Sequence, residues 1–332
     1  MRAGGRLLGM SALCLALACG RRTRETPSQS SVALTPSARS VASPASSSSS
    51  NGLEPTRLAT FPISAYAVSL ALDDRAIYLL TSNAAYRLAP GQPPRGMELE
   101  LGVGAVLTRS AFVYWSKGTI WRAAKEGGNP QALAKFGHPP QYFVASGEEF
   151  AFIDLGDDGL YTIRTLRGRE PRVLFSSKGE LSGLTLLGKS LYFVQRPQDG
   201  SWRIGVVQLD GTEPRFTAEK RGRRPAMLAG ADALYYYDLD DSELRSLSLD
   251  FGRSEARAKN LVCSPLAVAS AIYCGSVEGL FEVSKETRKP NGLALGRAGS
   301  ITSIAANPDQ IVWTIDIGPD RLAVDLLPVA RN

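Results

Sequence analysis

Phe112-Val113-Tyr114-Trp115 is a short apolar run that decides the fold, because six runs of the same kind recur along the chain. The other six are Ile77-Tyr78-Leu79, Phe150-Ala151-Phe152-Ile153, Leu191-Tyr192-Phe193-Val194, Leu234-Tyr235-Tyr236-Tyr237, Ile272-Tyr273-Cys274 and Ile311-Val312-Trp313. Their first residues lie 35, 38, 41, 43, 38 and 39 positions apart. A repeat of about forty residues, built only of strand-like segments, is typical of a β-propeller with one blade per repeat. The sequence therefore predicts an all-β, seven-bladed propeller over residues 53–332.

Each repeat divides into four strand-like segments. The first is small and aliphatic, as in Ala226-Met227-Leu228-Ala229 or Leu266-Ala267-Val268-Ala269, which suits the crowded strand nearest the ring axis. The second is the aromatic run, whose nearly continuous apolar character predicts a strand covered on both faces by neighbouring blades. The third alternates between apolar and polar residues, as in Leu160-Tyr161-Thr162-Ile163-Arg164, which marks a strand nearer solvent.

The fourth segment is the outer strand, which has a free edge and therefore tolerates proline at its start. We predict outer strands at 96–101, 131–136, 172–176, 215–218, 256–261 and 292–295. Four prolines are placed just before such strands: Pro130, Pro171, Pro214 and Pro290.

The last repeat, from Ile301 to Val329, contains only three of the four strands. The segment Pro55-Thr56-Arg57-Leu58-Ala59-Thr60-Phe61 matches Pro130-Gln131-Ala132-Leu133-Ala134-Lys135-Phe136 almost position for position. We therefore expect residues 55–61 to supply the outer strand of the last blade, which closes the ring without a covalent link.

The second repeat also resembles a known class of secreted propellers. Val113-Tyr114-Trp115-Ser116, followed by Gly118-Thr119-Ile120-Trp121-Arg122 and Gly127-Gly128-Asn129-Pro130, resembles the YWTD-type and TolB-like repeats. Across residues 53–329 as a whole, the chain shares the repeat length of these proteins, whereas the motif itself is matched well only in the second repeat. It implies a propeller fold and a binding role, and it carries over no catalytic residue.

The N-terminus has the features of an export signal. Arg2 and Arg6 precede a short apolar stretch from Leu7 to Ala18, so residues 1–18 are predicted to be a signal peptide. Cys19 directly follows Leu15-Ala16-Leu17-Ala18, as at a bacterial lipoprotein processing site, and we predict that Cys19 is lipidated and anchors the chain to a membrane. Ala16-Leu17-Ala18 is also an ordinary small-x-small cleavage site, so the alternative is a secreted, soluble protein. Both alternatives place the protein outside the cytoplasm.

Residues 19–52 follow as a segment rich in Ser, Pro and Ala, which lacks the apolar content to fold and is predicted to be a disordered tether. The net charge of the whole chain is +6, but residues 1–50 hold six Arg and one Glu, which leaves +1 for residues 51–332. A nearly neutral domain gives little support for nucleic-acid binding. We therefore predict no nucleic-acid partner.

Two of the four cysteines remain once Cys14 is assigned to the signal peptide and Cys19 to the lipid anchor. Cys263 and Cys274 lie on either side of the hairpin predicted between Leu266 and Tyr273, in an exported context where disulfides persist. They form either a disulfide across two antiparallel strands or a pair of small buried residues, and spacing alone does not decide between these.

The sequence offers no catalytic set. Its single histidine, His138, lies in the loop Gly137-His138-Pro139-Pro140 and would have to serve any triad or metal cluster alone. The acidic loops Asp154-Leu155-Gly156-Asp157-Asp158-Gly159 and Asp238-Leu239-Asp240-Asp241-Ser242-Glu243 do not have the spacing of a known Ca²⁺ loop. We predict no catalytic residue, no metal and no cofactor.

One rim of the ring is the predicted binding surface. Loops between second and third strands and connections between blades emerge on the same face of a propeller. This face gathers His138, Asp154, Asp157, Asp158, Arg196, Arg221, Arg223, Arg224, Asp238 and Asp240. Mixed charge on one rim suits recognition of a polar partner, although loops are also polar simply because they are exposed.

The function expected from the sequence is a non-catalytic cell-envelope lipoprotein whose propeller binds a protein or a glycan. Two alternatives stay open at this point. One is a Ca²⁺-dependent hydrolase or lactonase, which would need oxygen ligands on the inner strands; those strands are mostly Ala, Val, Leu and Thr. The other is a scaffold subunit of a larger assembly.

Overall fold

The computed structural model describes residues 54–62, 69–73, 76–81, 84–97, 99, 104–167, 169–225, 228–295, 299–318 and 320–329. The predicted signal peptide, Cys19 and the tether lie outside these residues. The chain divides into two units, Met1–Ser37 and Ala38–Asn332, and every described residue belongs to the second. Within the described residues every regular element is a β-strand, and none forms a helix of the length and hydropathy that crossing a membrane requires.

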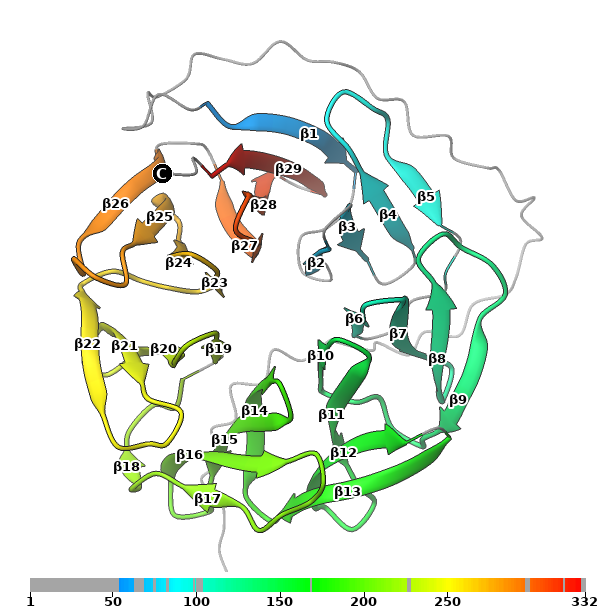
Figure 1. Cartoon of the computed structure of the whole chain (residues 1–332), viewed down its shortest axis with the longest axis vertical. Helices are drawn as coiled ribbons and strands as arrows, with labels where there is room; N and C mark the ends of the chain where they lie inside the picture. Colours follow the sequence, from blue (N-terminus) through cyan, green and yellow to red (C-terminus); the bar gives the residue numbers. More distant parts are fainter. Residues whose placement is uncertain are drawn as a thin grey trace, which may run out of the picture. The chain divides into compact units, whose positions relative to one another are not determined.

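The strands form seven antiparallel sheets, or blades, arranged around a central opening (Figure 1). From the inner to the outer strand, blades 1–3 are β2 (Ser69–Leu72), β3 (Ile77–Leu80), β4 (Ala85–Leu88), β5 (Arg95–Met97); β6 (Ala105–Leu107), β7 (Ala111–Ser116), β8 (Thr119–Ala124), β9 (Gln131–Lys135); and β10 (Tyr142–Ser146), β11 (Glu149–Leu155), β12 (Tyr161–Arg167), β13 (Glu170–Ser177). Blades 4 and 5 are β14 (Glu180–Leu187), β15 (Ser190–Arg196), β16 (Ser201–Gln208), β17 (Arg215–Phe216) with β18 (Lys220–Arg221); and β19 (Ala229–Gly230), β20 (Leu234–Asp238), β21 (Glu243–Leu247), β22 (Ser254–Lys259). Blades 6 and 7 are β23 (Leu266–Val268), β24 (Ile272–Gly275), β25 (Gly279–Val283), β26 (Pro290–Leu295); and β27 (Ser300–Ala306), β28 (Gln310–Gly318), β29 (Arg321–Pro328), β1 (Thr56–Phe61).

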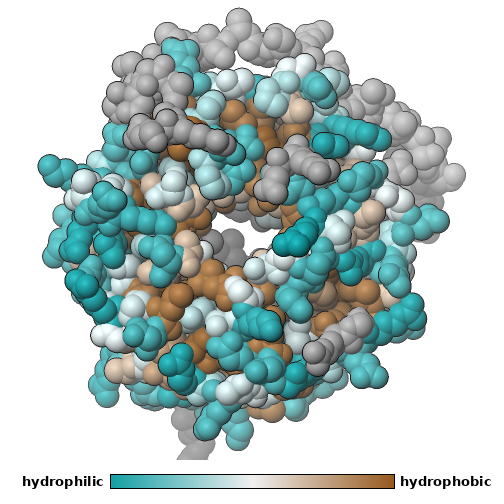
Figure 2. Space-filling view, in the orientation of Figure 1, coloured by the Kyte–Doolittle hydropathy of each residue, from teal (hydrophilic) through white to brown (hydrophobic). Residues whose placement is uncertain are grey.

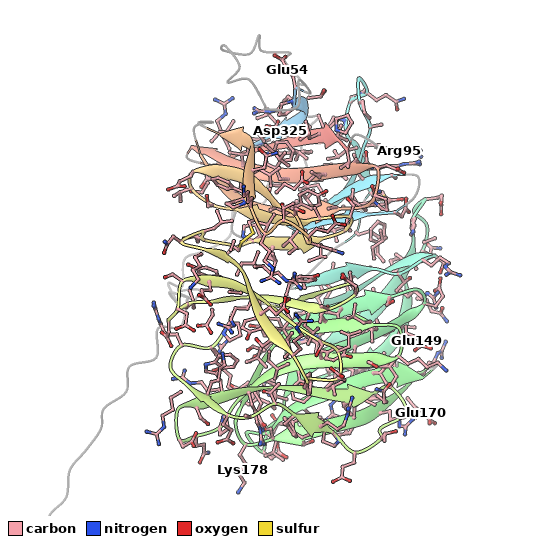
Figure 3. The ribbon with its side chains drawn as sticks, turned by 60° about the vertical axis from the view of Figure 1, so that its left-hand side comes forward. Glu54, Arg95, Glu149, Glu170, Lys178 and Asp325 are labelled. Carbon is pink, nitrogen blue, oxygen red and sulfur yellow. A yellow bond between two sulfur atoms is a disulfide. The ribbon has the colours of Figure 1, made fainter. Side chains whose placement is uncertain are left out.

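The predicted seven-bladed fold and its closure are confirmed. All seven apolar runs form the second strand of a blade. Strand β1 pairs antiparallel with β29, with Arg57 opposite Asp325 and Phe61 opposite Leu322. In Figure 1 the two strands lie side by side although they come from opposite ends of the described chain. Asp325 of β29 is fully buried, and Figure 3 labels its position. Arg57 donates from Nε and Nη2 to the two carboxylate oxygens of Asp325.

The core consists of seven apolar clusters, one at each interface between neighbouring blades. Phe61, Ile77, Leu79 and Leu322 pack between blades 7 and 1, so the closing interface resembles the others. Second strands such as β3 and β24 are buried along their whole length because a blade covers each of their faces. Apolar surface also borders the central opening, whereas hydrophilic side chains dominate the periphery of the face in view (Figure 2).

The outer strands differ from the prediction in their bounds: β5 and β22 begin one and two residues earlier than expected, and residues 98, 100 and 101 of the strand expected at 96–101 lie outside those described. Two further differences concern the prolines and blade 4. Pro171 and Pro290 lie within β13 and β26 rather than before them, because an outermost strand does not need every backbone N–H for pairing. In blade 4 the outer strand is broken in two. Arg221, expected in a connection, lies with Lys220 in β18, which pairs with Ser201 and Trp202 of β16. The expected strand at 215–218 is thus shorter and continues after a gap.

Candidate binding rim

The ring has two rims, defined by the loops that emerge on each. The front rim carries the loops between second and third strands and the connections between blades. The back rim carries the loops between first and second and between third and fourth strands. All ten rim residues predicted from the sequence lie at the front-rim ends of blades 3, 4 and 5 or in the connections that lead into them.

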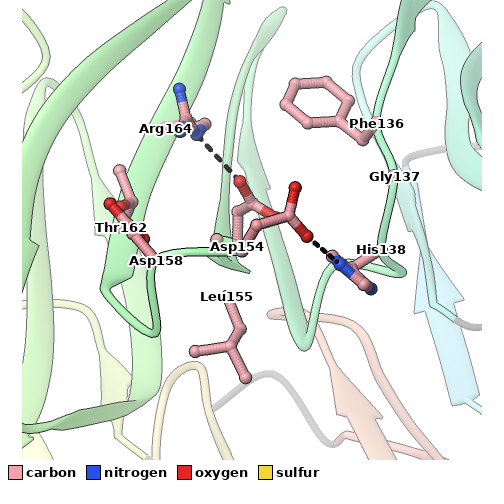
Figure 4. Close-up of a pocket in the computed structure, with 10 residues that line it drawn as sticks. Phe136, Gly137, His138, Asp154, Leu155, Asp158, Thr162 and Arg164 are labelled. Atoms are coloured by element: carbon pink, nitrogen blue, oxygen red, sulfur yellow. Dashed lines mark hydrogen bonds and ion pairs between the residues drawn. The ribbon is translucent and has the colours of Figure 1, made fainter.

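A cavity of about 390 Å³ opens on the front rim of blade 3 (Figure 4). One wall is the connection Phe136–His138, and the other is the loop that runs from Asp154 to Asp158. His138 Nε2 lies 2.7 Å from Asp157 Oδ1, and this pair joins the two walls across blades 2 and 3. Both side chains are largely exposed, so the pair remains accessible to a partner.

The floor of this cavity contains an ion pair that sequence reasoning missed. Arg164 of β12 donates from Nε to Asp154 Oδ2 at 3.0 Å, and the Asp154 side chain is only 9% exposed. Asp154 was expected in a loop; it is the sixth residue of β11, where the sheet buries it. The alternation of β12 places Arg164 and Thr162 on the same face, a signal that could have identified Arg164.

Blade 5 repeats this arrangement with different residues. Asp238 ends β20, is 4% exposed, and pairs with Lys220 Nζ at 3.4 Å. Asp240, two residues later, accepts hydrogen bonds from the Arg223 backbone N–H at 2.7 Å and from Arg223 Nε at 3.0 Å. These two hydrogen bonds and the nearby guanidinium charge hold the pKa of Asp240 below its usual value. Asp238 was also expected in a loop, and its burial withdraws it from the surface.

The backbone at Gly222 lies very close to Asp240, so the contact between Arg223 and Asp240 depends on a glycine at this position. Gly222 has φ +109°, and a Cβ atom there would lie 1.8 Å from Asp240 Oδ2. Glycine adopts this backbone conformation readily, and it has no side chain that would displace the Asp240 carboxylate. The connection between blades 4 and 5 is thereby fixed to the loop of blade 5.

Arg224 is less available than the sequence suggested. Its guanidinium donates to Ser182 Oγ at 2.8 Å and to Glu180 Oε1, both on the inner strand β14, and its side chain is 23% exposed. Ser182 is completely buried. Arg224 therefore braces the connection against blade 4 rather than facing a partner.

Blade 6 adds an apolar feature to the front rim. Val262 and Val277 are 52% and 77% exposed, and they are two of the three large exposed hydrophobic residues in the described part of the chain. Cys263 and Cys274 between them are joined in a disulfide with a Cα–Cα distance of 4.6 Å. The disulfide fixes the connection that carries Val262 against the strand that leads to Val277.

The back rim holds a repeated bridge between blades that the sequence did not reveal. In blade 1, Tyr78 OH lies 3.5 Å from Asp73 Oδ2, which also pairs with Lys125 Nζ of blade 2 at 2.6 Å. In blade 5, Tyr235 OH lies 3.3 Å from Asp232, which pairs with Lys285 Nζ of blade 6 at 2.7 Å. Burial, reinforced by the nearby Asp carboxylate, raises the pKa of Tyr78 to about 12 and of Tyr235 to about 12.

These bridges predict a loss of stability at high pH. Between pH 10 and 12 the unfolded chain releases the phenolic protons of Tyr78 and Tyr235 while the folded chain keeps them, so the folded state binds more protons and becomes less stable as pH rises. We expect the urea midpoint of the wild type to fall more steeply from pH 9 to pH 11.5 than that of a Tyr78→Phe/Tyr235→Phe variant. Equal slopes would contradict this assignment, and the midpoints at pH 8 control for the loss of the two hydroxyl groups.

A second cavity of about 390 Å³ lies on the back rim, between Arg95 of blade 1 and the turn from Glu126 to Pro130 of blade 2. Across the described ranges, no group of three or more His, Cys, Asp or Glu side chains is arranged to hold a metal ion. Neither acidic loop therefore forms such a group.

Comparison with known proteins supports the fold. No protein-family model and no curated protein matches the chain. Among solved structures, the chain is similar to the AfRom2 CNH domain (TM-score 0.61, 14% identity, covering 84% of this chain and 100% of that domain). It is also similar to the WD40 β-propeller domain of Doa1 (TM-score 0.57, 12% identity, 81% and 96%). A puromycin-hydrolyzing peptidase of Mycobacterium tuberculosis matches with TM-score 0.59 and 13% identity over 77% of this chain and 52% of its own, so the chain spans about half of that protein.

At these identities the likenesses show a propeller and nothing finer. The resemblance to YWTD-type and TolB-like repeats stays a prediction, as do the export signal and the lipid anchor.

Proposed function

We propose that this protein is a non-catalytic cell-envelope lipoprotein whose propeller binds a protein or glycan partner on its front rim. Acylated Cys19 would hold it to a membrane, and residues 19–52 would let the propeller reach about 30 Å from that anchor. The observation that carries the proposal is the convergence of exposed charged side chains from three consecutive blades on one rim, on loops that internal hydrogen bonds and ion pairs already hold in place.

The fixed loops support binding because a preorganised surface loses little conformational entropy when a partner docks. His138–Asp157 joins blades 2 and 3, and Arg223–Asp240 joins the connection after blade 4 to blade 5. Val262 and Val277 add apolar area on the same rim, which favours a protein partner over a glycan. For the hydrolase alternative, no observation among the described residues provides comparable support.

A capture experiment with the full-length protein tests the front rim. We expect a partner retained from envelope extracts to be reduced at least fivefold by Asp157→Asn/Asp158→Asn, because two exposed carboxylates on the cavity wall lose their charge without a change of shape. The matched control is Glu170→Gln/Glu213→Gln, which neutralises two exposed carboxylates at the back rim of blades 3 and 4. Failure to retain any partner, or equal loss in both variants, would contradict the proposal.

The anchor is tested independently by mass analysis of the native N-terminus. An acyl-modified Cys19 supports the lipoprotein assignment, whereas an unmodified Cys19 or cleavage at another residue contradicts it.

A further inference from the structure

The front-rim edge of blade 4 carries three exposed basic side chains for which the described part of the structure provides no ion pair or hydrogen-bond acceptor: Lys178, Arg196 and Arg221. Lys178 lies in the connection into the blade, Arg196 ends β15, and Arg221 lies in β18. In Figure 3 the Lys178 side chain points away from the ribbon. Nothing in the fold of this blade requires these three charges.

Strand pairing places the three residues along a single sheet edge. Arg196 is opposite Glu180, two residues after Lys178, and the Gly179 backbone packs directly on the backbone of Arg196. Arg221 is opposite Ser201, on the strand next to β15. Adjacent strands are about 4.8 Å apart, so the row spans roughly 15 Å. The row is therefore short enough for one ligand to contact all three cations.

The acids around this row are already engaged. Glu180 pairs with Arg224, and Glu219 pairs with Arg203 at 3.4 Å. Asp199 accepts hydrogen bonds from the Ser201 backbone N–H and hydroxyl. It also attracts Arg221 electrostatically, and its negative charge therefore offsets part of the positive charge of the three cations. Three cations against one carboxylate leave a net charge of +2 on this edge.

Acidic loops flank the basic row on both sides. The blade 3 loop presents Asp157, whose side chain is 94% exposed, and Asp158. The blade 5 loop presents Asp241, whose side chain is 58% exposed although it also lies 3.7 Å from Arg245 Nη1. A flat anionic membrane would bring negative charge against these two flanks as well as against the basic row. A protein segment can instead place acidic residues on the row alone, because its charge is patterned on the scale of a few residues.

We propose that the edge of blade 4 formed by Lys178, Arg196 and Arg221, hereafter the basic row, is the docking site for an acidic segment of a protein partner. The proposal rests on the front rim being the binding surface, and it specifies which part of the rim binds and the chemistry of the ligand. The acidic loops of blades 3 and 5 reject uniformly anionic surfaces and attract basic residues of the partner that lie beside its acidic segment, so the flanks contribute specificity and further contacts while the basic row binds the acidic segment itself.

The test uses the full-length protein and a fluorescent ten-residue peptide of Glu and Asp as the probe. We expect the peptide to bind, and Lys178→Ala/Arg196→Ala/Arg221→Ala to weaken its affinity about tenfold at low salt. Raising the salt concentration to 0.3 M should weaken wild-type binding to a similar extent, because screening shortens the reach of exposed charges. The matched control is Arg109→Ala/Arg169→Ala/Lys189→Ala, which removes the same charge from exposed residues on the back rim and should change affinity less than twofold.

Three results would overturn the proposal. The first is equal weakening of peptide binding in both triple variants, which would mean that net charge and not the row attracts the probe. The second is binding of phosphatidylglycerol vesicles, but not of the peptide, that depends on the basic row, which would assign the row to a membrane surface. Retention of an envelope partner that is insensitive to the basic row but lost in the Asp157/Asp158 variant would leave the proposed function standing while excluding this docking site.

Discussion

Replacing Arg57 with Ala is expected to lower the free energy of unfolding by about 3 kcal/mol. Arg57 lies on β1 and is the cationic partner of Asp325, whose side chain is fully buried on β29. Loss of the guanidinium removes a cation that pairs with a buried carboxylate, at the only blade that is assembled from both ends of the described chain. Because the Arg57 side chain is 38% exposed, we place the cost at the lower end of the range for buried pairs.

Urea unfolding of the full-length protein measures this effect, with Arg95→Ala as the control. Arg95 is also an arginine on an outer strand, in the neighbouring blade 1, but it is exposed and has no ion pair among the described residues. We expect Arg95→Ala to change stability by less than about 0.5 kcal/mol. Arg57→Met combined with Asp325→Leu should recover most of the loss, because apolar residues can replace a buried ion pair. A loss for Arg57→Ala no larger than that for Arg95→Ala would show that the pair does not hold the ring closed.

The closure was predictable because it depends on a local pattern that occurs twice. Residues 55–61 resemble 130–136, and β1 and β9 occupy the same outer position in blades 7 and 2. The period of the aromatic runs was equally informative, because a second strand covered on both faces must be apolar along its length. Both features can be recognised without knowing which residues of other blades they contact.

The contacts on the rims were not predictable for the opposite reason. Asp73 and Lys125 are 52 residues apart, and His138 and Asp157 are 19 apart, so each contact depends on how neighbouring blades are placed. The burial of Asp154 and Asp238 follows from one or two extra residues at the end of a strand, which propensity does not determine. The front rim could thus be located from topology, while its division into paired, buried and free charges required the structure.

The break in the outer strand of blade 4 was also not predictable from the sequence, and it determines where Arg221 of the proposed docking site lies. Thr217 still pairs with Ile204 through its backbone and its hydroxyl, and the chain then pairs again only at Lys220 and Arg221. This second pairing fixes the position of Arg221 at the end of the basic row. From the sequence alone, Arg221, Arg223 and Arg224 were assigned to the rim without distinction. In the structure Arg223 and Arg224 are paired, as is the neighbouring Lys220, whereas Arg221 has no ion pair among the described residues.

Removing the disulfide is expected to cost about 2.8 kcal/mol of unfolding free energy. Cys263 and Cys274 are 11 residues apart, and a cross-link of that span lowers the entropy of the unfolded chain by roughly this amount. Both residues are fully buried in the cluster between blades 5 and 6, so Ala is a small replacement that retains some of the packing. We expect Cys263→Ala, Cys274→Ala and the double variant to lose nearly equal stability, because any one of them removes the cross-link.

The same variants separate the stability of the ring from the order of the front rim. The disulfide joins the connection carrying Val262 to the strand preceding Val277, so its loss should increase hydrogen exchange at Ser276–Gly279 while β20 and β24 remain protected. Urea unfolding and hydrogen exchange on the full-length protein measure the two effects. Additive losses in the single variants would mean that each cysteine contributes through packing alone, and unchanged exchange at Ser276–Gly279 would mean that the turn of blade 6 is held by its own hydrogen bonds. Either outcome would show that the disulfide does not position Val262 and Val277.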